Sequence, residues 1–198
     1  MTLPLESSRG YSVLELVFVA SLGVTLTAGA LPQYLSAVDD FRAAGATRYV
    51  AARFQRARME AVMRSAHVAL QFTQTASGYS YAVYVDGNRN GVQTRDIQRG
   101  IDRLVGAPEQ LPDQFTGVEF GAIPGLPAVD AGSTAPGTDP IRLGSGNVAS
   151  FSAFGTSSSG TVYIRSRRDA QYAVRIFGET GRTRMWKFDR GAREWRPL

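Results

Sequence analysis

The sequence predicts an α+β protein in which one long N-terminal helix packs on an antiparallel β-sheet domain. Residues 16–38 hold no charged residue over 23 positions, and residues 39–65 hold no proline and are rich in alanine and arginine. From residue 68 onward, short runs of β-branched and aromatic residues alternate with polar ones and are separated by turns rich in Gly, Ser and Pro. The first pattern is typical of helix and the second of strand.

The uncharged run is long enough to cross a membrane. At about 1.5 Å per residue, its 23 residues span a hydrocarbon core of about 30 Å. Gly23, Gly29 and Pro32 weaken a helix in water, whereas a membrane tolerates them better. We therefore expect residues 11–38 to form the transmembrane half of a helix and residues 39–66 its amphipathic half.

Three interpretations of this segment compete. The tripeptide Ala28, Gly29 and Ala30 fits the cleavage site of a secretory signal, for which Arg9 supplies a thin basic end. The second interpretation is a plain membrane anchor. The third depends on Glu15, because an ionised carboxylate costs about 2.5–3.5 kcal/mol at the centre of a membrane helix. A signal peptide has no use for it, but a helix that packs against its own kind does if Glu15 meets a positive partner.

Residues 9–19, Arg-Gly-Tyr-Ser-Val-Leu-Glu-Leu-Val-Phe-Val, resemble the leader and first helix of type IV pilins and pseudopilins. The resemblance implies that residues 1–10 are a leader, which prepilin peptidase removes by cutting after Gly10. Tyr11 would then become the N-methylated first residue, where the family usually has Phe. Glu15 would pair with the N-terminal amine of a neighbouring subunit during assembly.

The implied topology is one pass through the inner membrane with a periplasmic C-terminal domain, which is incorporated into a filament. Charge alone does not select it. The leader holds only Arg9, while Arg42, Arg48 and Arg53 follow the apolar run, against the positive-inside rule. The resemblance therefore decides the orientation.

The second half of the helix carries an apolar stripe. Val50, Phe54, Ala57 and Ala61 recur at helical spacing, which predicts packing on a sheet. We expect the arginines off this stripe to be solvated and Arg56 to pair with Glu60. Residues 57–64, Ala-Arg-Met-Glu-Ala-Val-Met-Arg, also resemble the end of this helix in the GspH/FimT branch of pseudopilins, where the first strand follows directly.

The β-sheet domain is expected over residues 67–198. Alternation predicts strands at 68–75 and 79–85, at 161–165 and 172–177, and at 182–188. The segment 86–91, Asp-Gly-Asn-Arg-Asn-Gly, resembles the opening of a calcium loop, but Ile97 stands where a bidentate carboxylate is required. We favour an Asx-rich turn, which the GspH/FimT family also has here. Residues 121–140 hold four prolines and four glycines, which predicts a mobile loop.

Composition argues against an enzyme. The chain has no cysteine and one histidine, His67, so a thiolate metal site, a histidine cluster and a cysteine nucleophile are excluded. No nucleophile–base pair is recognisable, and we expect no catalytic residue, cofactor or metal. The alternative, an anchored or secreted hydrolase, would gain weight from a mature N-terminus at Leu31.

The basic charge is concentrated at the C-terminus. Residues 1–150 contain 12 Arg against 13 acidic residues, whereas residues 151–198 contain 10 Lys and Arg against 4 acidic residues. Period-2 alternation places Arg182 and Arg184 on one face with Trp186 and Phe188. Arginines interleaved with aromatic side chains suit nucleic acid, and equally suit a soluble edge strand.

Residues 181–184, Gly-Arg-Thr-Arg, resemble a motif of FimT-type minor pilins, which bind DNA for uptake. The resemblance adds DNA as a partner of the chain, beside other pilins or pseudopilins, prepilin peptidase and the inner-membrane assembly platform. The alternative is a GspH-like minor pseudopilin of a type II secretion system, which exports protein without binding DNA. The candidate DNA-binding residues are Arg182, Arg184, Lys187, Arg190 and Arg193.

Overall fold

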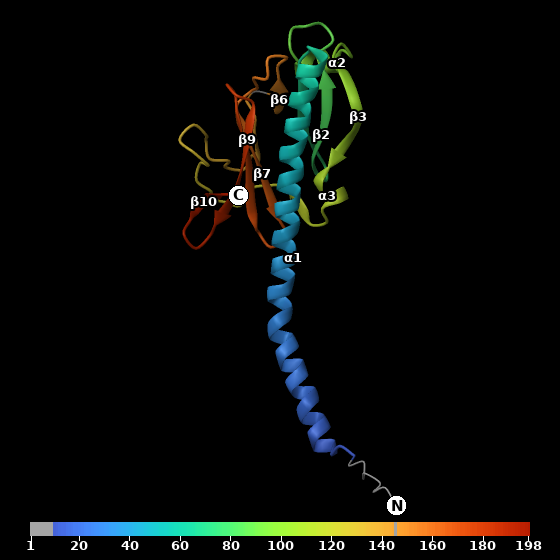
Figure 1. The fold of residues 1–198 in the computed structure, drawn as a ribbon, viewed down its shortest axis with the longest axis vertical. Helices are drawn as coiled ribbons and strands as arrows, with labels where there is room; N and C mark the ends of the chain where they lie inside the picture. The colour runs from blue at the N-terminus through green and yellow to red at the C-terminus, as the bar shows by residue number, and fades with distance from the viewer. Residues whose placement is uncertain (1–9, 145) are drawn as a thin grey trace, which may run out of the picture. The chain divides into compact units, whose positions relative to one another are not determined.

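The computed structural model describes residues 10–144 and 146–198 (Figure 1). The chain divides between Val38 and Asp39 into two compact units. Helix α1 (Val13–Arg64) contributes its first half to the N-terminal unit and its second half to the C-terminal unit.

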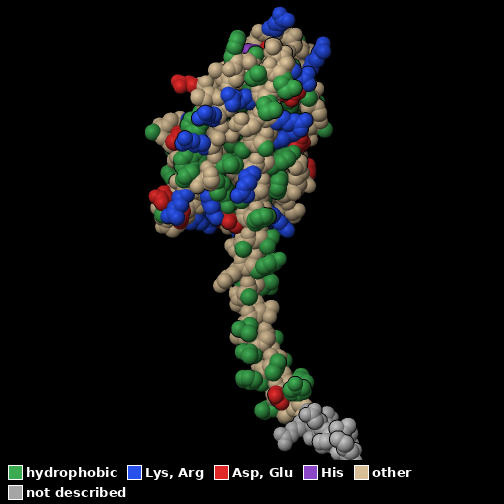
Figure 2. Space-filling view, in the orientation of Figure 1, with side chains coloured by type: hydrophobic (Ala, Val, Ile, Leu, Met, Phe, Trp, Pro, Cys, Tyr) green, Lys and Arg blue, Asp and Glu red, His purple; other side chains and the backbone are tan. Residues whose placement is uncertain are grey.

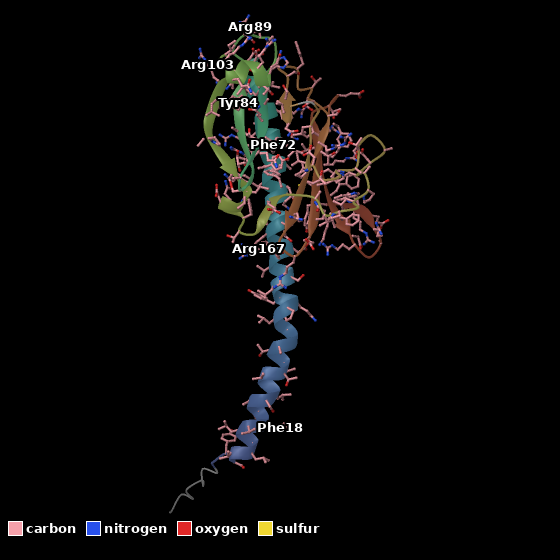
Figure 3. All side chains as sticks on the ribbon, turned by 180° about the vertical axis from the view of Figure 1, so that it is seen from behind. Phe18, Phe72, Tyr84, Arg89, Arg103 and Arg167 are labelled. Carbon is pink, nitrogen blue, oxygen red and sulfur yellow. The ribbon has the colours of Figure 1, made fainter. Side chains whose placement is uncertain are left out.

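The N-terminal unit is an apolar helix with few polar groups left on its surface. Ser12 begins it by accepting hydrogen bonds from the backbone N–H groups of Leu14 (3.3 Å) and Leu16 (3.0 Å). The hydroxyls of Thr25 and Thr27 donate to carbonyl oxygens four residues earlier, at 2.8 and 2.7 Å. Large apolar side chains project outward along it (Figure 2), among them Phe18 (Figure 3). In the described part of the chain, α1 alone is long and apolar enough to cross a membrane.

The C-terminal unit contains two antiparallel sheets. In the first, the strand order is β3-β2-β1-β6; in the second it is β10-β9-β8-β7-β4, with β5 also paired to β7. The strands of the first sheet are β1 (Val68–Thr75), β2 (Gly78–Val85), β3 (Arg103–Gln110) and β6 (Val148–Phe151). Those of the second are β4 (Val118–Phe120), β5 (Ile141–Arg142), β7 (Gly160–Ser166), β8 (Gln171–Phe177), β9 (Arg182–Asp189) and β10 (Glu194–Pro197). Two short helices are α2 (Thr94–Gln98) and α3 (Leu111–Gln114).

One core joins the second half of α1 to both sheets. Phe54 is fully buried and lies against Phe72 of β1 and Phe151 of β6, with ring centroids 6.2 Å apart in each pair. From the second sheet, Val174 and Ile176 of β8 enter the same cluster. Figure 3 shows Phe72 in the interior of this unit. The predicted stripe of α1 is confirmed, because its four members are all buried.

Two aspartates fasten the start of this half-helix to the second sheet. Asp39 is buried and accepts a hydrogen bond from the backbone N–H of Arg168 at 2.9 Å. The Asp40 carboxylate accepts hydrogen bonds from the Tyr172 hydroxyl (2.9 Å) and from Nζ of Lys187 (2.8 Å). The helix is therefore held by polar contacts at the residue where the C-terminal unit begins.

A second polar cluster centres on Glu109 of β3. Its carboxylate accepts hydrogen bonds from the Tyr49 hydroxyl (2.6 Å) and the Tyr81 hydroxyl (2.7 Å), and it pairs with Arg53. Burial by itself would raise the pKa of Glu109, but these three donors outweigh it and hold the pKa below its usual value. The cluster ties α1 to the edge of the first sheet.

Residues 121–140 form no helix or strand, and β5 begins directly after them. They cover the outer face of the second sheet. Leu126 and Val129 are buried there against Tyr163 and Phe188. Nη2 of Arg175 donates to the Gly132 carbonyl at 2.7 Å. These contacts hold the segment at Leu126, Val129 and Gly132, so the predicted mobility concerns only the residues between them. That mobility remains a prediction.

The α+β class and the predicted strands are confirmed, with ends that shift by at most one residue. One antiparallel domain was expected, and it is built from two sheets. Strand β3 was not predicted, because Gly106 and Pro108 interrupt its alternation; its pairing with β2 shifts register there. The expected Arg56–Glu60 pair is wrong, since Glu60 binds Arg64 at 2.8 Å.

We expect Glu109→Gln to flatten the acid limb of the stability curve. Since the pKa of Glu109 is lowered on folding, its contribution is complete above the unfolded value near 4.3 and is lost as pH falls through the folded value. At pH 7 the variant should lose about 1–3 kcal/mol of unfolding free energy. Urea unfolding in detergent at several pH values between 7 and 3 measures both effects.

The matched control is Glu119→Gln, which removes a half-exposed partner of Arg165. A surface pair of this kind contributes about 0–1 kcal/mol. Equal losses in the two variants would show that Glu109 has no special role.

Candidate functional site

The predicted assembly residues lie at the start of α1. Gly10 and Tyr11 precede the helix and are exposed, and Glu15 lies in its first turn. Residues 1–9 of the predicted leader lie outside the described residues.

The position of Glu15 has a local electrostatic consequence. With Ser12 at the helix start, Glu15 is three residues on, the spacing of a capping box. A carboxylate in the first turn gains about 0.3–1 kcal/mol from the helix dipole. That is less than the cost of about 2.5–3.5 kcal/mol for an ionised group deep in a membrane. The helix end alone would therefore not offset the cost of an ionised Glu15 deep in a membrane.

Arg182 and Arg184 share the outer face of β9, as the alternation predicts. Both are exposed, and the Arg184 guanidinium lies 5.7 Å from the ring centroid of Phe177. With Phe177 and Glu179 they line an open hollow of about 430 Å³. Neither guanidinium makes an ion pair within the described residues. These two arginines are available to an outside anion.

The other three candidate DNA-binding residues lie elsewhere. Lys187 is on the opposite face of β9, bound to Asp40, with Nζ 5.7 Å from the Tyr172 ring centroid. Arg190 donates to the Asp169 carbonyl at 2.7 Å and pairs with its carboxylate at 3.3 Å. Arg193 is exposed in the turn between β9 and β10. The five predicted residues thus form no continuous patch.

A contact that sequence reasoning missed joins the two motifs. Nε of Arg58, from the helix-end motif, donates to the Gly155 carbonyl at 3.0 Å. Gly181, from the Gly-Arg-Thr-Arg motif, sits against both groups with a φ of +60°. A Cβ at Gly181 would clash with the Gly155 oxygen and approach Nε of Arg58 to 2.8 Å. The spacing of 123 residues gives no signal of this contact.

The segment 86–91 forms a turn whose carboxylate accepts hydrogen bonds from the backbone of the same turn. The Asp86 carboxylate accepts backbone N–H bonds from Asn88 (3.0 Å), Arg89 (2.8 Å) and Gly91 (2.8 Å). Asp96 is buried nearby and accepts the side-chain amide of Asn90 at 2.9 Å, the main cause of its lowered pKa. The geometry is that of the predicted Asx-rich turn, with the carboxylates directed at N–H groups.

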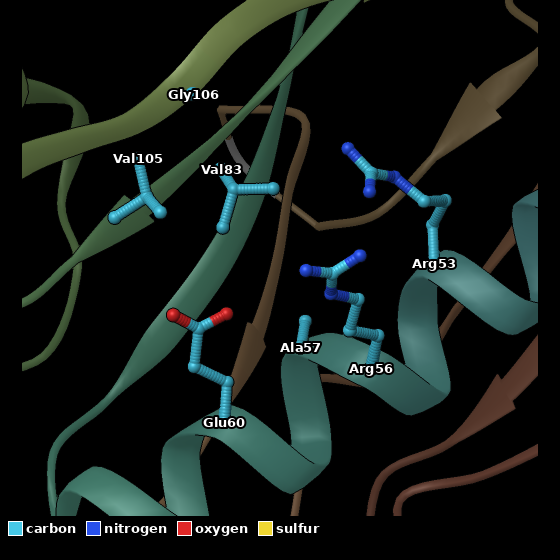
Figure 4. A pocket seen from close by; sticks show the side chains of 7 residues that line it. All are labelled: Arg53, Arg56, Ala57, Glu60, Val83, Val105 and Gly106. Atoms are coloured by element: carbon cyan, nitrogen blue, oxygen red, sulfur yellow. The ribbon is translucent and has the colours of Figure 1, made fainter.

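A small hollow of about 160 Å³ lies between α1 and the strands β2 and β3 (Figure 4). The guanidinium groups of Arg53 and Arg56 lie at one side and the Glu60 carboxylate at another. The hollow is smaller than the 300 Å³ or more that is usual for small-molecule sites. Its lining of two guanidinium groups, one carboxylate and apolar side chains includes no hydroxyl, thiol or imidazole.

Comparison with known proteins gives one family. The model of the family described as type II transport protein GspH matches residues 46–180. The match runs from the second half of α1 through β8, and it ends just before Arg182. No curated protein and no solved structure matches the chain.

We expect Gly181→Ala to destabilise the fold more than a φ penalty explains. The matched control is Gly125→Ala, because Gly125 has a similar φ of +75° and no heavy atom within 4 Å of an added Cβ. The control should lose about 1–2 kcal/mol, the cost of a left-handed Ala. Gly181→Ala should lose about 1–3 kcal/mol more from overpacking. Chemical unfolding of both variants measures the difference, and equal losses would mean that the turn yields freely.

Proposed function

Because the chain belongs to the family of type II transport protein GspH, we propose that it serves as a minor pseudopilin, a non-enzymatic subunit of an inner-membrane filament machine. The family has a structural role, in type II secretion or in pilus-like machinery. The observation that carries the proposal is the matched α1–β8 region preceded by an exposed apolar helix. Such a helix fits storage in the inner membrane, with the C-terminal unit on the periplasmic side.

The proposed mechanism is assembly. Prepilin peptidase cleaves after Gly10, and the amine of Tyr11 is freed and methylated. The Glu15 carboxylate of an incoming subunit pairs with that amine on its neighbour, which neutralises both charges within an apolar bundle. The assembly platform then draws the helix from the bilayer into a filament, where other pseudopilins replace lipid around residues 16–38.

We expect Glu15→Ala to insert into the membrane normally and to lose incorporation into filaments. Removing the charge favours insertion, while the amine of the neighbour stays buried and unpaired, so incorporation should fall by at least tenfold. The measurement is the amount of the chain in sheared filaments, or captured with a co-expressed partner pseudopilin, relative to the amount in membranes.

The matched control is Ser12→Ala, which removes the hydroxyl that begins α1 and leaves Glu15 in place. If Glu15 only caps the helix, both variants should lose incorporation alike. Retention of Glu15→Ala in filaments at the native level contradicts the docking role.

Two kinds of filament machine fit this subunit, a type II secretion system and a type IV pilus. The family description favours type II secretion, in which the chain needs no affinity for DNA. The exposed, unpaired Arg182 and Arg184 favour an additional role in DNA binding, as in a type IV pilus for DNA uptake. They lie outside the matched residues, so this role depends on their geometry and on the resemblance of residues 181–184 to the FimT-type motif.

We expect duplex DNA to bind with a strong salt dependence if Arg182 and Arg184 contact it. Contacts to about three phosphates give a slope near −2.7 in log affinity against log salt, and loss of two leaves about −0.9. Titrations of the full chain and of Arg182→Ala/Arg184→Ala in detergent measure both slopes. Arg190→Ala/Arg193→Ala is the charge-matched control. Unchanged affinity in the first variant assigns the chain to the secretion role alone.

A further inference from the structure

We infer that the start of the C-terminal unit carries a contact surface for anionic phospholipid headgroups. The surface consists of Arg42, Arg167 and Arg168 together with the exposed ring of Phe41, and it is called the basal surface below. The inference rests on the membrane anchor of the proposed function. It concerns residues that neither the family match nor the docking role of Glu15 explains.

Arg42 lies close to the end of the uncharged run. Val38 is the last residue of the uncharged run, and Arg42 follows it by four helical residues, which is about 6 Å of rise. Headgroups add about 5–7 Å to each side of the hydrocarbon core. With residues 16–38 in the core, the Arg42 guanidinium therefore lies within the headgroup layer, whereas Arg48 lies beyond it.

The loop between β7 and β8 lies beside the start of the C-terminal unit. The backbone N–H of Arg168 donates to the Asp39 carboxylate at 2.9 Å, which fixes this loop beside the first residue of the unit. Arg167 precedes it, and Figure 3 shows Arg167 next to α1 at this end of the C-terminal unit. Cations from two distant parts of the sequence thus lie near the start of this half-helix.

Three acidic groups at this end are bound within the unit. Asp39 is only 7% exposed and bound to backbone, Asp40 is bound by Tyr172 and Lys187, and Asp169 pairs with Arg190. Within residues 10–144 and 146–198, no salt bridge involves the side chains of Arg42, Arg167 or Arg168. Their charge is therefore free to act on an external anion.

The exposed ring of Phe41 favours a surface that contacts lipid over a surface that binds only polar ligands. Its side chain is 76% exposed, directly beside Arg42. In water such exposure has no benefit, whereas at a membrane interface an apolar ring enters the acyl boundary while neighbouring arginines reach the phosphates. A phosphodiester headgroup also suits the fork of a guanidinium. The positive-inside rule does not predict cations on the side of the membrane opposite the leader. Contact with lipid phosphates gives these cations a role.

The test is lipid selectivity of the full chain. The protein is reconstituted in vesicles of phosphatidylcholine with one fifth phosphatidylglycerol, and spin-labelled forms of each lipid report their relative association. We expect the native chain to prefer phosphatidylglycerol, and Arg42→Gln/Arg168→Gln to lower the preference by about fivefold or more. Raising the salt to 1 M should weaken the native preference, since the Debye length falls to about 3 Å.

The matched control is Arg182→Gln/Arg184→Gln, which removes the same charge from exposed positions on β9. It should keep the native preference, and circular dichroism should show all three proteins folded. Equal loss in both variants, or a native chain without preference, overturns the basal surface while leaving the anchor intact. A native chain that does not float with the vesicles overturns the anchor of the proposed function, and the basal surface with it.

Discussion

The C-terminal unit depends on one constraint: a single face of α1 must be buried against two sheets at once. Phe54, with neighbouring small side chains such as Ala57 and Ala61, lets backbone and ring approach both sheets closely. Polar groups hold this half of α1 in place at both of its ends, Asp39 and Asp40 at the start and Arg58 near the end. Burial supplies the stabilisation, and the polar ends fix which register of the helix is stable.

That arrangement explains which parts were predictable. Periodicity reports burial, so the stripe on α1 and the buried strands of the second sheet could be recognised from residue types alone. Strand β3 is an exposed edge, and Gly106 and Pro108 protect it from pairing with other chains while removing the alternation that would reveal it. The split into two sheets follows from long-range pairing, which no local pattern carries.

The two sets of candidate residues, at the N-terminus and in the C-terminal stretch, were predictable to different extents. Gly10, Tyr11 and Glu15 form a compact motif whose chemistry is local, so the sequence holds all that the docking hypothesis uses. The basic C-terminal stretch looks uniform in sequence, yet alternation sends Lys187 to the face opposite Arg184, where Asp40 binds it. Whether a cation is free depends on acids distant in the sequence, and only the fold places them.

The same distinction gives the cations of this chain two kinds of use. Arg53, Arg58 and Lys187 meet buried or half-buried acceptors, and removing one leaves an unpaired polar group inside the unit. Arg42, Arg168 and Arg182 meet no acid among the described residues, so their desolvation is never required for folding. In the proposed passage from a bilayer into a filament, the subunit would exchange lipid for protein neighbours. Cations that folding leaves free are the ones that can change partners in that exchange, because giving up a headgroup disrupts nothing within the fold.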